Sequence, residues 1–273
     1  MPSPLPYASP IVAERPTYLP RFRRPPLAEV AMSVVFQPLR TMTGAHHGLY
    51  WETIRERFPT SADQPPIDTV YETEGGPEGP ALEIRFGSPQ LRSFFRSADD
   101  EELIQVQADR FVHNWRKGDG HYPHFEQLWA DFSLHWEGFT AFASTHGLGR
   151  PVPEQVELTY VNLVDDRSLP ESLTVGGPQR LQLPGAPPDT ALRAEEFQTA
   201  LRYRLTGEPL ARLYATVAPR GPAWMLEITV RSRLADDDQK FGDAFFRART
   251  AVDTAFSALT TTTAQTAWGI ISS

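Results

Sequence analysis

The feature that most constrains the fold is a change in hydrophobic period that occurs twice along the 273-residue chain. Each time, segments in which apolar and polar residues alternate precede a long segment whose apolar residues stand three or four positions apart. Alternation is typical of strands with one buried face, and the wider spacing is typical of helices. The two long helices are predicted at 123–146 and 241–259. The sequence therefore predicts two units, each made of strands followed by a helix.

The strands in front of each long helix follow a similar order. In the first half, a short helix is predicted at 46–58, and strands are predicted at 27–36, 82–86, 91–97 and 102–116. In the second half, strands are predicted at 155–164, 197–205, 211–218 and 224–233, with a loop or short helix over 165–195. Arg-Pro precedes the first strand of each half, at Arg24 and Arg150. We interpret the chain as two β-α-βββ-α pseudo-repeats, an internal duplication.

Because each predicted strand has one apolar face, the two halves are expected to share one antiparallel sheet backed by two long helices. This α+β arrangement resembles the TATA-binding-protein fold and helix-grip folds in element order, a likeness that implies no activity. Eight of the 26 prolines lie in the first 26 residues, which predicts a flexible tail over 1–24. The halves are then 25–149 and 150–273.

Composition excludes several kinds of chemistry. The absence of cysteine excludes disulfides, thiol nucleophiles, thiolate zinc sites and iron–sulfur clusters. With 26 Lys and Arg against 34 Asp and Glu, the formal charge of −8 disfavours non-specific nucleic-acid binding. No apolar run reaches the length of a membrane span, so we expect a cytoplasmic protein without a membrane partner. Nucleotide, hydrolase and zinc-peptidase motifs are missing, so an enzyme is disfavoured and no cofactor is predicted.

Cationic side chains gather near 110–117 and on two strands of the second half. The candidates for holding a protein partner or a small anionic ligand are Arg110, Asn114, Arg116, Lys117, Arg202, Arg204, Arg231 and Arg233. Phe111 and Trp115 lie among the first four and can supply stacking surfaces. The arginines of the second half alternate along their strands and would share one sheet face. An alternative is that these cations form ion pairs with sheet neighbours such as Glu227.

Four of the seven histidines lie between residues 113 and 135. The candidate metal ligands are His113, His121, His124 and Glu126, which offer the nitrogen and oxygen donors that zinc and similar ions accept. Their spacing matches no established ligand motif, so packed or solvated histidines are the favoured alternative. Asp165 and Asp166 are adjacent, and neighbouring residues of a strand point to opposite faces, so a turn is predicted there rather than a carboxylate pair.

Three segments together resemble a sporadically distributed bacterial family of about this length that has no established activity. They are Arg24-Pro-Pro-Leu-Ala-Glu-Val-Ala31, the run from Glu102 to Lys117, and Thr159-Tyr-Val-Asn162. The likeness covers about residues 24–268 and implies no catalytic residue. Sporadic distribution is common among mobile and host-defence genes, so the resemblance implies a role in anti-phage defence or in a toxin–antitoxin-like pair.

The sequence thus favours a non-enzymatic binding or adaptor protein that uses the polar sheet face or the Arg110–Lys117 edge. A metal-dependent enzyme built on the histidines is one alternative. A saddle whose sheet binds nucleic acid is another. The sequence leaves open whether the polar face is exposed or covered by a second copy in a homodimer.

Overall fold

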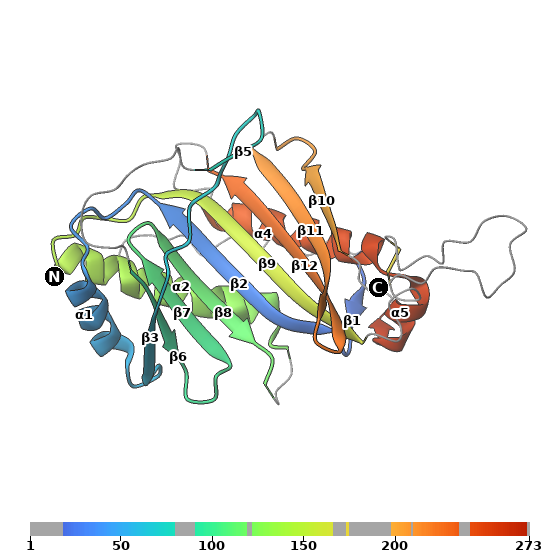
Figure 1. Ribbon diagram of the computed structural model, residues 1–273, viewed down its shortest axis with the longest axis horizontal. Helices are drawn as coiled ribbons and strands as arrows, with labels where there is room; N and C mark the ends of the chain where they lie inside the picture. Colours follow the sequence, from blue (N-terminus) through green and yellow to red (C-terminus); the bar gives the residue numbers. More distant parts are fainter. Residues whose placement is uncertain are drawn as a thin grey trace, which may run out of the picture.

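The chain forms one large sheet with helices on one side (Figure 1). The computed structural model describes residues 19–79, 91–118, 122–165, 173–174, 198–208, 210–234 and 241–271. The sheet strands are β2 (Leu27–Phe36), β3 (Thr60–Gln64), β6 (Arg92–Arg96), β7 (Glu102–Gln107), β8 (Arg110–Arg116), β9 (Pro153–Asp165), β10 (Thr199–Arg204), β11 (Ala211–Arg220) and β12 (Ala223–Arg233). They lie in the order β10-β11-β12-β9-β2-β8-β7-β6-β3, and every neighbouring pair is antiparallel.

The remaining elements are short pairs of strands and the helices. Strand β1 (Arg21–Phe22) pairs with β13 (Ile270–Ile271), and β4 (Tyr71–Glu72) pairs with β5 (Pro77–Glu78). The helices are α1 (Gly44–Ile54), α2 (His124–Thr145), α4 (Phe241–Leu259) and α5 (Thr262–Ala267). The predicted α+β class, with an antiparallel sheet packed against helices, is confirmed. Within the described ranges, no helix is both long and apolar enough to cross a membrane.

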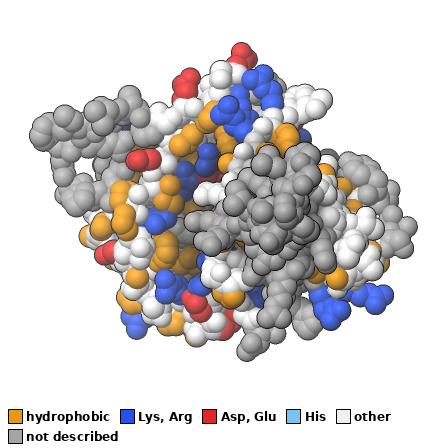
Figure 2. Space-filling model, turned by 45° about the vertical axis from the view of Figure 1, so that its right-hand side comes forward, with side chains coloured by type: hydrophobic (Ala, Val, Ile, Leu, Met, Phe, Trp, Pro, Cys, Tyr) orange, Lys and Arg blue, Asp and Glu red, His pale blue; other side chains and the backbone are white. Residues whose placement is uncertain are grey.

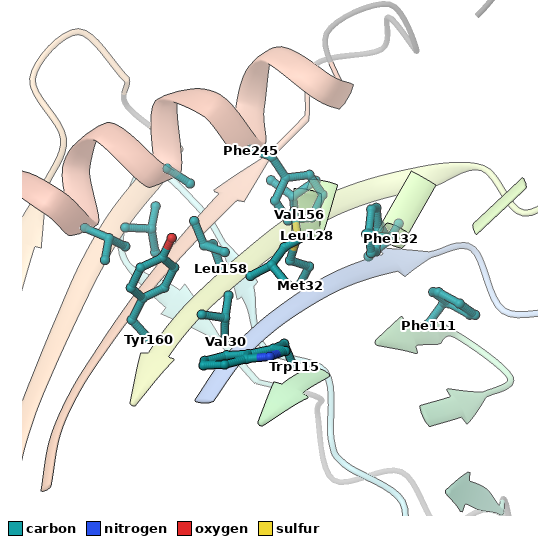
Figure 3. Close-up of a cluster of buried hydrophobic side chains, with 14 of the residues drawn as sticks. Val30, Met32, Phe111, Trp115, Leu128, Phe132, Val156, Leu158, Tyr160 and Phe245 are labelled. Carbon is teal, nitrogen blue, oxygen red and sulfur yellow. The ribbon is translucent and has the colours of Figure 1, made fainter. Parts of the chain in front are cut away.

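Helices α2 and α4 cover the same face of the sheet and pack through aromatic side chains. Phe132 of α2 is fully buried, and its ring centroid lies 5.1 Å from that of Phe245 of α4. Figure 3 shows Met32 and Leu158 rising from β2 and β9 toward Phe245. Aromatic side chains bury large apolar areas and add specific ring contacts, so this layer supplies much of the stability. The helical spacing of aromatics in the sequence therefore marks the interface between the helices and the sheet.

The predicted strand at 102–116 is wrong as a single strand, because it is a hairpin. Strands β7 and β8 pair with each other around a turn at Ala108 and Asp109. The buried face changes parity at this turn: Ile104 faces the helices before it, and Phe111 faces them after it. A continuous strand cannot change parity without a bulge. The predicted strand at 82–86 lies outside the described residues, and β3 at the sheet edge was not predicted because its sequence is polar.

The described end of the predicted tail packs on the body of the protein. Leu19 is 5% exposed, and β1 pairs with β13. The backbone N–H groups of Arg23 and Arg24 donate to the carbonyls of Gly269 and Trp268. Residues 19–24 are therefore held against the C-terminal segment, which corrects the expectation of a flexible tail for this part.

The first four strands follow a matching order outward from the centre in both directions. On one side of the β2–β9 contact the order is β2-β8-β7-β6, with β3 added at the edge, and on the other it is β9-β12-β11-β10. Each long helix follows the strand next to the centre, α2 after β8 and α4 after β12. We call β2, β6 to β8 and α2 the first half, and β9 to β12 and α4 the second half.

Candidate functional site

The sheet face turned away from α2 and α4 carries the predicted ligand-binding residues. The strand register places all of them except Lys117 on this polar face: Arg110, Asn114, Arg116, Arg202, Arg204, Arg231 and Arg233. Lys117 follows β8 and is exposed. On the face seen in Figure 2, Lys and Arg side chains lie in separate groups among apolar and uncharged surface. The arginines of the second half do share one sheet face, as predicted.

Most of these cations already have partners on the chain. Arg110 donates to Glu157 at 2.6 Å, and Arg231 Nε lies 3.6 Å from the same carboxylate. Arg116 contacts Asp100 at 2.8 Å, and Asn114 donates to the carboxylate of Glu29. An anion approaching these groups would have to displace a carboxylate. The geometry therefore favours the ion-pair alternative over a free anion-binding row.

The chain itself covers one end of the polar face. The segment Ile67–Glu74, which we call the strap, runs across the strands toward β5 (Figure 1). Gln107 of β7 makes two hydrogen bonds to the backbone of Ile67, both 2.9 Å long. Gln155 of β9 likewise donates to the Val70 carbonyl and accepts from the Glu72 N–H. Two glutamine side chains thus hold the strap as a neighbouring strand would, by satisfying its backbone groups.

Glu72 is the point at which the strap enters the second half. Its side chain is fully buried and accepts from Arg212 at 2.8 Å and from the Tyr214 hydroxyl at 2.7 Å. Burial and the bond to Glu72 raise the pKa of Tyr214 to about 12. Arg233 stacks on the Tyr71 ring at 4.5 Å, and Arg204 donates to the Glu74 carbonyl. These two predicted ligand-binding arginines are therefore used to hold the strap.

A smaller part of the polar face stays accessible on β6. The half-buried ring of Phe94 lies between two guanidinium groups, that of Arg92 at 4.9 Å and that of Arg96 at 6.0 Å. Burial and the nearby charge of Arg110 lower the pKa of Arg92. The sequence analysis missed this group, although the alternation of Arg, Phe and Arg within 92–96 was visible in it. Arg202 also remains exposed, on the edge strand β10.

A cavity of about 300 Å³ lies between the sheet and α4, at the end where β1 joins β2. We call it the tyrosine pocket. Its apolar walls include Phe22, Pro25, Leu27 and Phe256, and its polar groups come from Arg21, Tyr122, His124, Glu126, Tyr160, Asn162, Arg249 and Asp253. Tyr160 and Asn162 belong to one of the three segments that carry the family resemblance, and Pro25 and Leu27 belong to another. These segments meet at the pocket because β2 and β9 are neighbours.

Two phenols define the chemistry of this pocket. The Tyr122 and Tyr160 hydroxyl oxygens are 3.1 Å apart, and either can be the donor. Burial raises the pKa of both phenols well above their usual value, so both stay protonated at neutral pH. One of the two hydroxyl protons makes the bond between them. The other can be donated to a third atom.

A charged cluster closes the side of the pocket formed by the helices. Arg249 of α4 contacts Glu126 of α2 at 2.6 Å and Asp253 at 3.7 Å. Burial opposes the charge of Arg249, but its hydrogen bond to Glu126 raises its pKa, so it stays cationic. His124 has a φ of 66°, a left-handed conformation that is uncommon outside glycine and costs about 1–3 kcal/mol. Such strained residues gather at binding sites, which supports a functional reading of this pocket.

The predicted metal ligands do not come together. His124 and Glu126 line the tyrosine pocket, His121 lies outside the described residues, and His113 lies elsewhere. His113 instead lies next to Glu102 of β7 and His135 of α2, and the ligand atoms of these three residues all lie within 4.8 Å of one another. His124 and His135 are eleven positions apart on α2, which is about 16 Å along a helix, so one ion cannot reach both. Glu102 and His135 were missed because sequence spacing cannot show a strand-to-helix contact.

Asp165 ends β9, and Asp166 lies outside the described residues. The predicted turn at this pair is therefore described only as far as its first residue. Searches of protein-family models and of curated proteins found no match to this chain.

Proposed function

We propose that this chain is a binding protein for a small, largely uncharged organic molecule held in the tyrosine pocket. The observation that carries the proposal is the pair of neutral phenols inside a cavity of about 300 Å³. Ligand pockets are concave and mostly apolar, with a few polar groups that fix orientation. The tyrosine pair supplies such groups, and the apolar walls supply the rest.

The charges around the pocket favour a neutral ligand. Two arginines, Arg21 and Arg249, and two carboxylates, Glu126 and Asp253, line the pocket, so their charges balance. Arg249 already contacts both carboxylates. An anionic ligand would have to compete with both, whereas a carbonyl or amide oxygen needs only the phenolic proton. The pocket therefore suits a hydrogen-bond acceptor with an apolar body better than the anion expected on the polar face.

The proposal can be tested with a panel of small aromatic amides and the matching carboxylates, using ligand-observed NMR on the full chain. We expect some amides to bind and Y122F/Y160F to weaken that binding, because the double variant removes both phenolic protons, whereas a single variant would leave one phenol free to donate. Y203F is the matched control, since Tyr203 is 49% exposed on β10 and away from the pocket. Equal binding to wild type, Y122F/Y160F and Y203F would contradict the proposal, and so would binding confined to the carboxylates.

A protein partner on the polar face is the second candidate, and the accessible Arg92–Phe94–Arg96 group favours it. An acidic partner would meet two cations and one ring there, a composition found at interface hot spots. Co-purification with the products of neighbouring genes tests this candidate, and R92A/R96A should abolish capture. Nucleic acid on the same face would instead give binding that falls steeply with salt.

The finer description of the fold also remains a proposal. We infer an internal duplication that gives a saddle-like molecule of the TATA-binding-protein or helix-grip kind, in a protein of the bacterial family named above. The mirrored strand order about β2 and β9 supports it. So does the matched position of the two long helices.

A further inference from the structure

Two buried histidines where α2 packs on the sheet, His113 of β8 and His135 of α2, each have an unsatisfied Nε2 atom within the described residues. His113 is 2% exposed and His135 is 8% exposed. The Nε2 atom of each has no partner within the part of the chain that the structure describes. Buried polar atoms are nearly always satisfied, so two unsatisfied nitrogens whose rings lie 5.2 Å apart call for a ligand or a cause.

The fold itself does not require histidine at this place. The strand register aligns one row of buried residues across the core face: Ile104, His113, Met32, Leu158, Val230 and Leu213. Five of these six are apolar, and the position that corresponds to His113 in the second half is Val230. A valine packs in such a row without leaving a polar atom unsatisfied. The histidine therefore needs a reason other than packing.

Glu102 completes a group with the donor types of a metal site. It comes from β7, and its carboxylate is in the set whose ligand atoms all lie within 4.8 Å. Burial lowers the pKa of His113 to about 3 and that of His135 to about 4. Both rings are therefore neutral at physiological pH, and neutral imidazole is the form that coordinates metals.

Half of the residues that line the cavity beside His113 are acidic. Its volume is about 170 Å³, and its carboxylates belong to Asp99, Glu101, Glu102 and Asp131. Arg57 counters part of this charge, since it binds Glu102 through two hydrogen bonds of 2.6 and 3.0 Å. Negative charge along a cavity attracts cations to it. The surroundings therefore favour a cation at the histidines, with Arg57 as its competitor.

We propose that Glu102, His113 and His135 bind a divalent transition-metal ion, for which Zn²⁺ is the fitting probe. Two imidazoles and one carboxylate form a donor set that suits zinc, and three protein ligands leave a fourth position open. The fourth position would face the acidic cavity. The site is separate from the tyrosine pocket, so it goes beyond the proposed function.

The test is a titration of the metal-stripped full chain with ZnCl₂ by calorimetry, with Co²⁺ absorption as a report on coordination geometry. We expect wild type to bind a single ion per chain. E102Q should raise the dissociation constant for Zn²⁺ by at least about tenfold. Losses of this size are seen even when the substituted residue only hydrogen-bonds to a metal ligand. H113V/H135L should abolish binding. H47N is the matched control, because His47 is also buried but bonds to Ser93.

Arg57 gives a second test. If the histidines had a purely structural role, substitution of Arg57 would not change Zn²⁺ binding. Removing its charge in R57Q frees Glu102 and should tighten Zn²⁺ binding by roughly tenfold, because a like charge is lost a few ångströms from the ion. No Zn²⁺ binding by wild type, or equal binding by wild type, E102Q and H47N, would overturn the proposal. If H113V/H135L does not fold, E102Q and R57Q decide the question, since both positions are partly exposed.

Discussion

The two halves of the sheet differ most at one aligned position of the core face. Opposite Met32 on β2 stands His113, and opposite Leu158 on β9 stands Val230. The second half thus continues the apolar row, while the first half places an imidazole in it. The same strand arrangement accepts either residue. What differs is the chemistry of the side chain, because an imidazole has nitrogen atoms that can coordinate a metal and valine has none.

The polar face also has two regions that differ, one where the strap contacts the second half and one at the centre of the sheet. In the second half, Arg212 and Glu72 form a pair whose side chains are 4% and 0% exposed. At the centre, Glu157 lies between Arg110 and Arg231, so either arginine can neutralise it. Loss of Arg212 leaves the Glu72 carboxylate with the Tyr214 hydroxyl but without the cation that contacts it, whereas Glu157 keeps one arginine when the other is lost. The buried pair at the strap and the shared carboxylate at the centre therefore differ in how they respond to the loss of an arginine.

The largest predicted effect comes from the residue that joins both halves in the core. Phe132 is fully buried and contacts Phe111 of the first half and Phe245 of the second. We expect F132A to lower the free energy of unfolding by about 3–5 kcal/mol. Urea unfolding measures it. L134A on the same helix is the control, because Leu134 is 60% exposed and should cost about 0.5 kcal/mol or less.

The next prediction separates the two kinds of ion pair. R212M leaves the Glu72 carboxylate buried without its cation and should cost about 3–5 kcal/mol. R110M should cost clearly less, about 1–2 kcal/mol, because Arg231 still neutralises Glu157. Chemical denaturation of both variants makes the comparison. A greater loss in R110M than in R212M would show that the shared carboxylate offers no protection.

The tyrosine pocket predicts a loss of stability at high pH. Because burial raises the pKa of Tyr122 and Tyr160, the unfolded chain releases protons above pH about 10 while the folded chain keeps them. Their contribution is complete below pH 10 and falls as the pH rises, by up to about 1.4 kcal/mol per pH unit for each phenol. The melting temperature should therefore fall less between pH 9 and pH 11 for Y122F/Y160F than for wild type. Identical pH slopes would count against a protonated pair.

The smallest predicted effect tests the aligned position itself. In the absence of metal, H113V makes the first half resemble the second and removes one unsatisfied nitrogen. We expect a change in unfolding free energy within about 1 kcal/mol, since replacing an unsatisfied buried polar group by an apolar one can be neutral or stabilising. Thermal and urea unfolding of the stripped protein measure it. A loss of about 3 kcal/mol would mean that the fold needs His113.

Parts of this structure follow from local patterns alone. The helices over 123–146 and 241–259 and the strand over 27–36 were predicted close to their observed bounds. The hairpin of β7 and β8 was missed, although the change of parity between Ile104 and Phe111 marks it. Strand β3 carries no apolar pattern, because it lies at the sheet edge, where neither face is deeply buried.

The candidate sites were less accessible to sequence reasoning. The pattern identified His113 as unusual but joined it to His124 and Glu126, which lie in the first turn of α2 and line the tyrosine pocket. His135 was visible on the aromatic face of that helix, at the spacing of Phe132 and Phe139. Its contact with Glu102 depends on how α2 packs on β7 and β8. No local pattern encodes that packing.

The sequence by itself determined the secondary structure class, the two long helices and the polar or apolar character of each sheet face, because hydrophobic periodicity is a local property of the chain. Only the tertiary structure decided which cations are free, which end of the polar face the strap covers, and which side chains form the two pockets. Those outcomes depend on contacts between residues 40 to 140 positions apart, such as Gln107 with Ile67 and Arg212 with Glu72. Their energies come from burial and pairing, which exist only once the strands and helices have assembled.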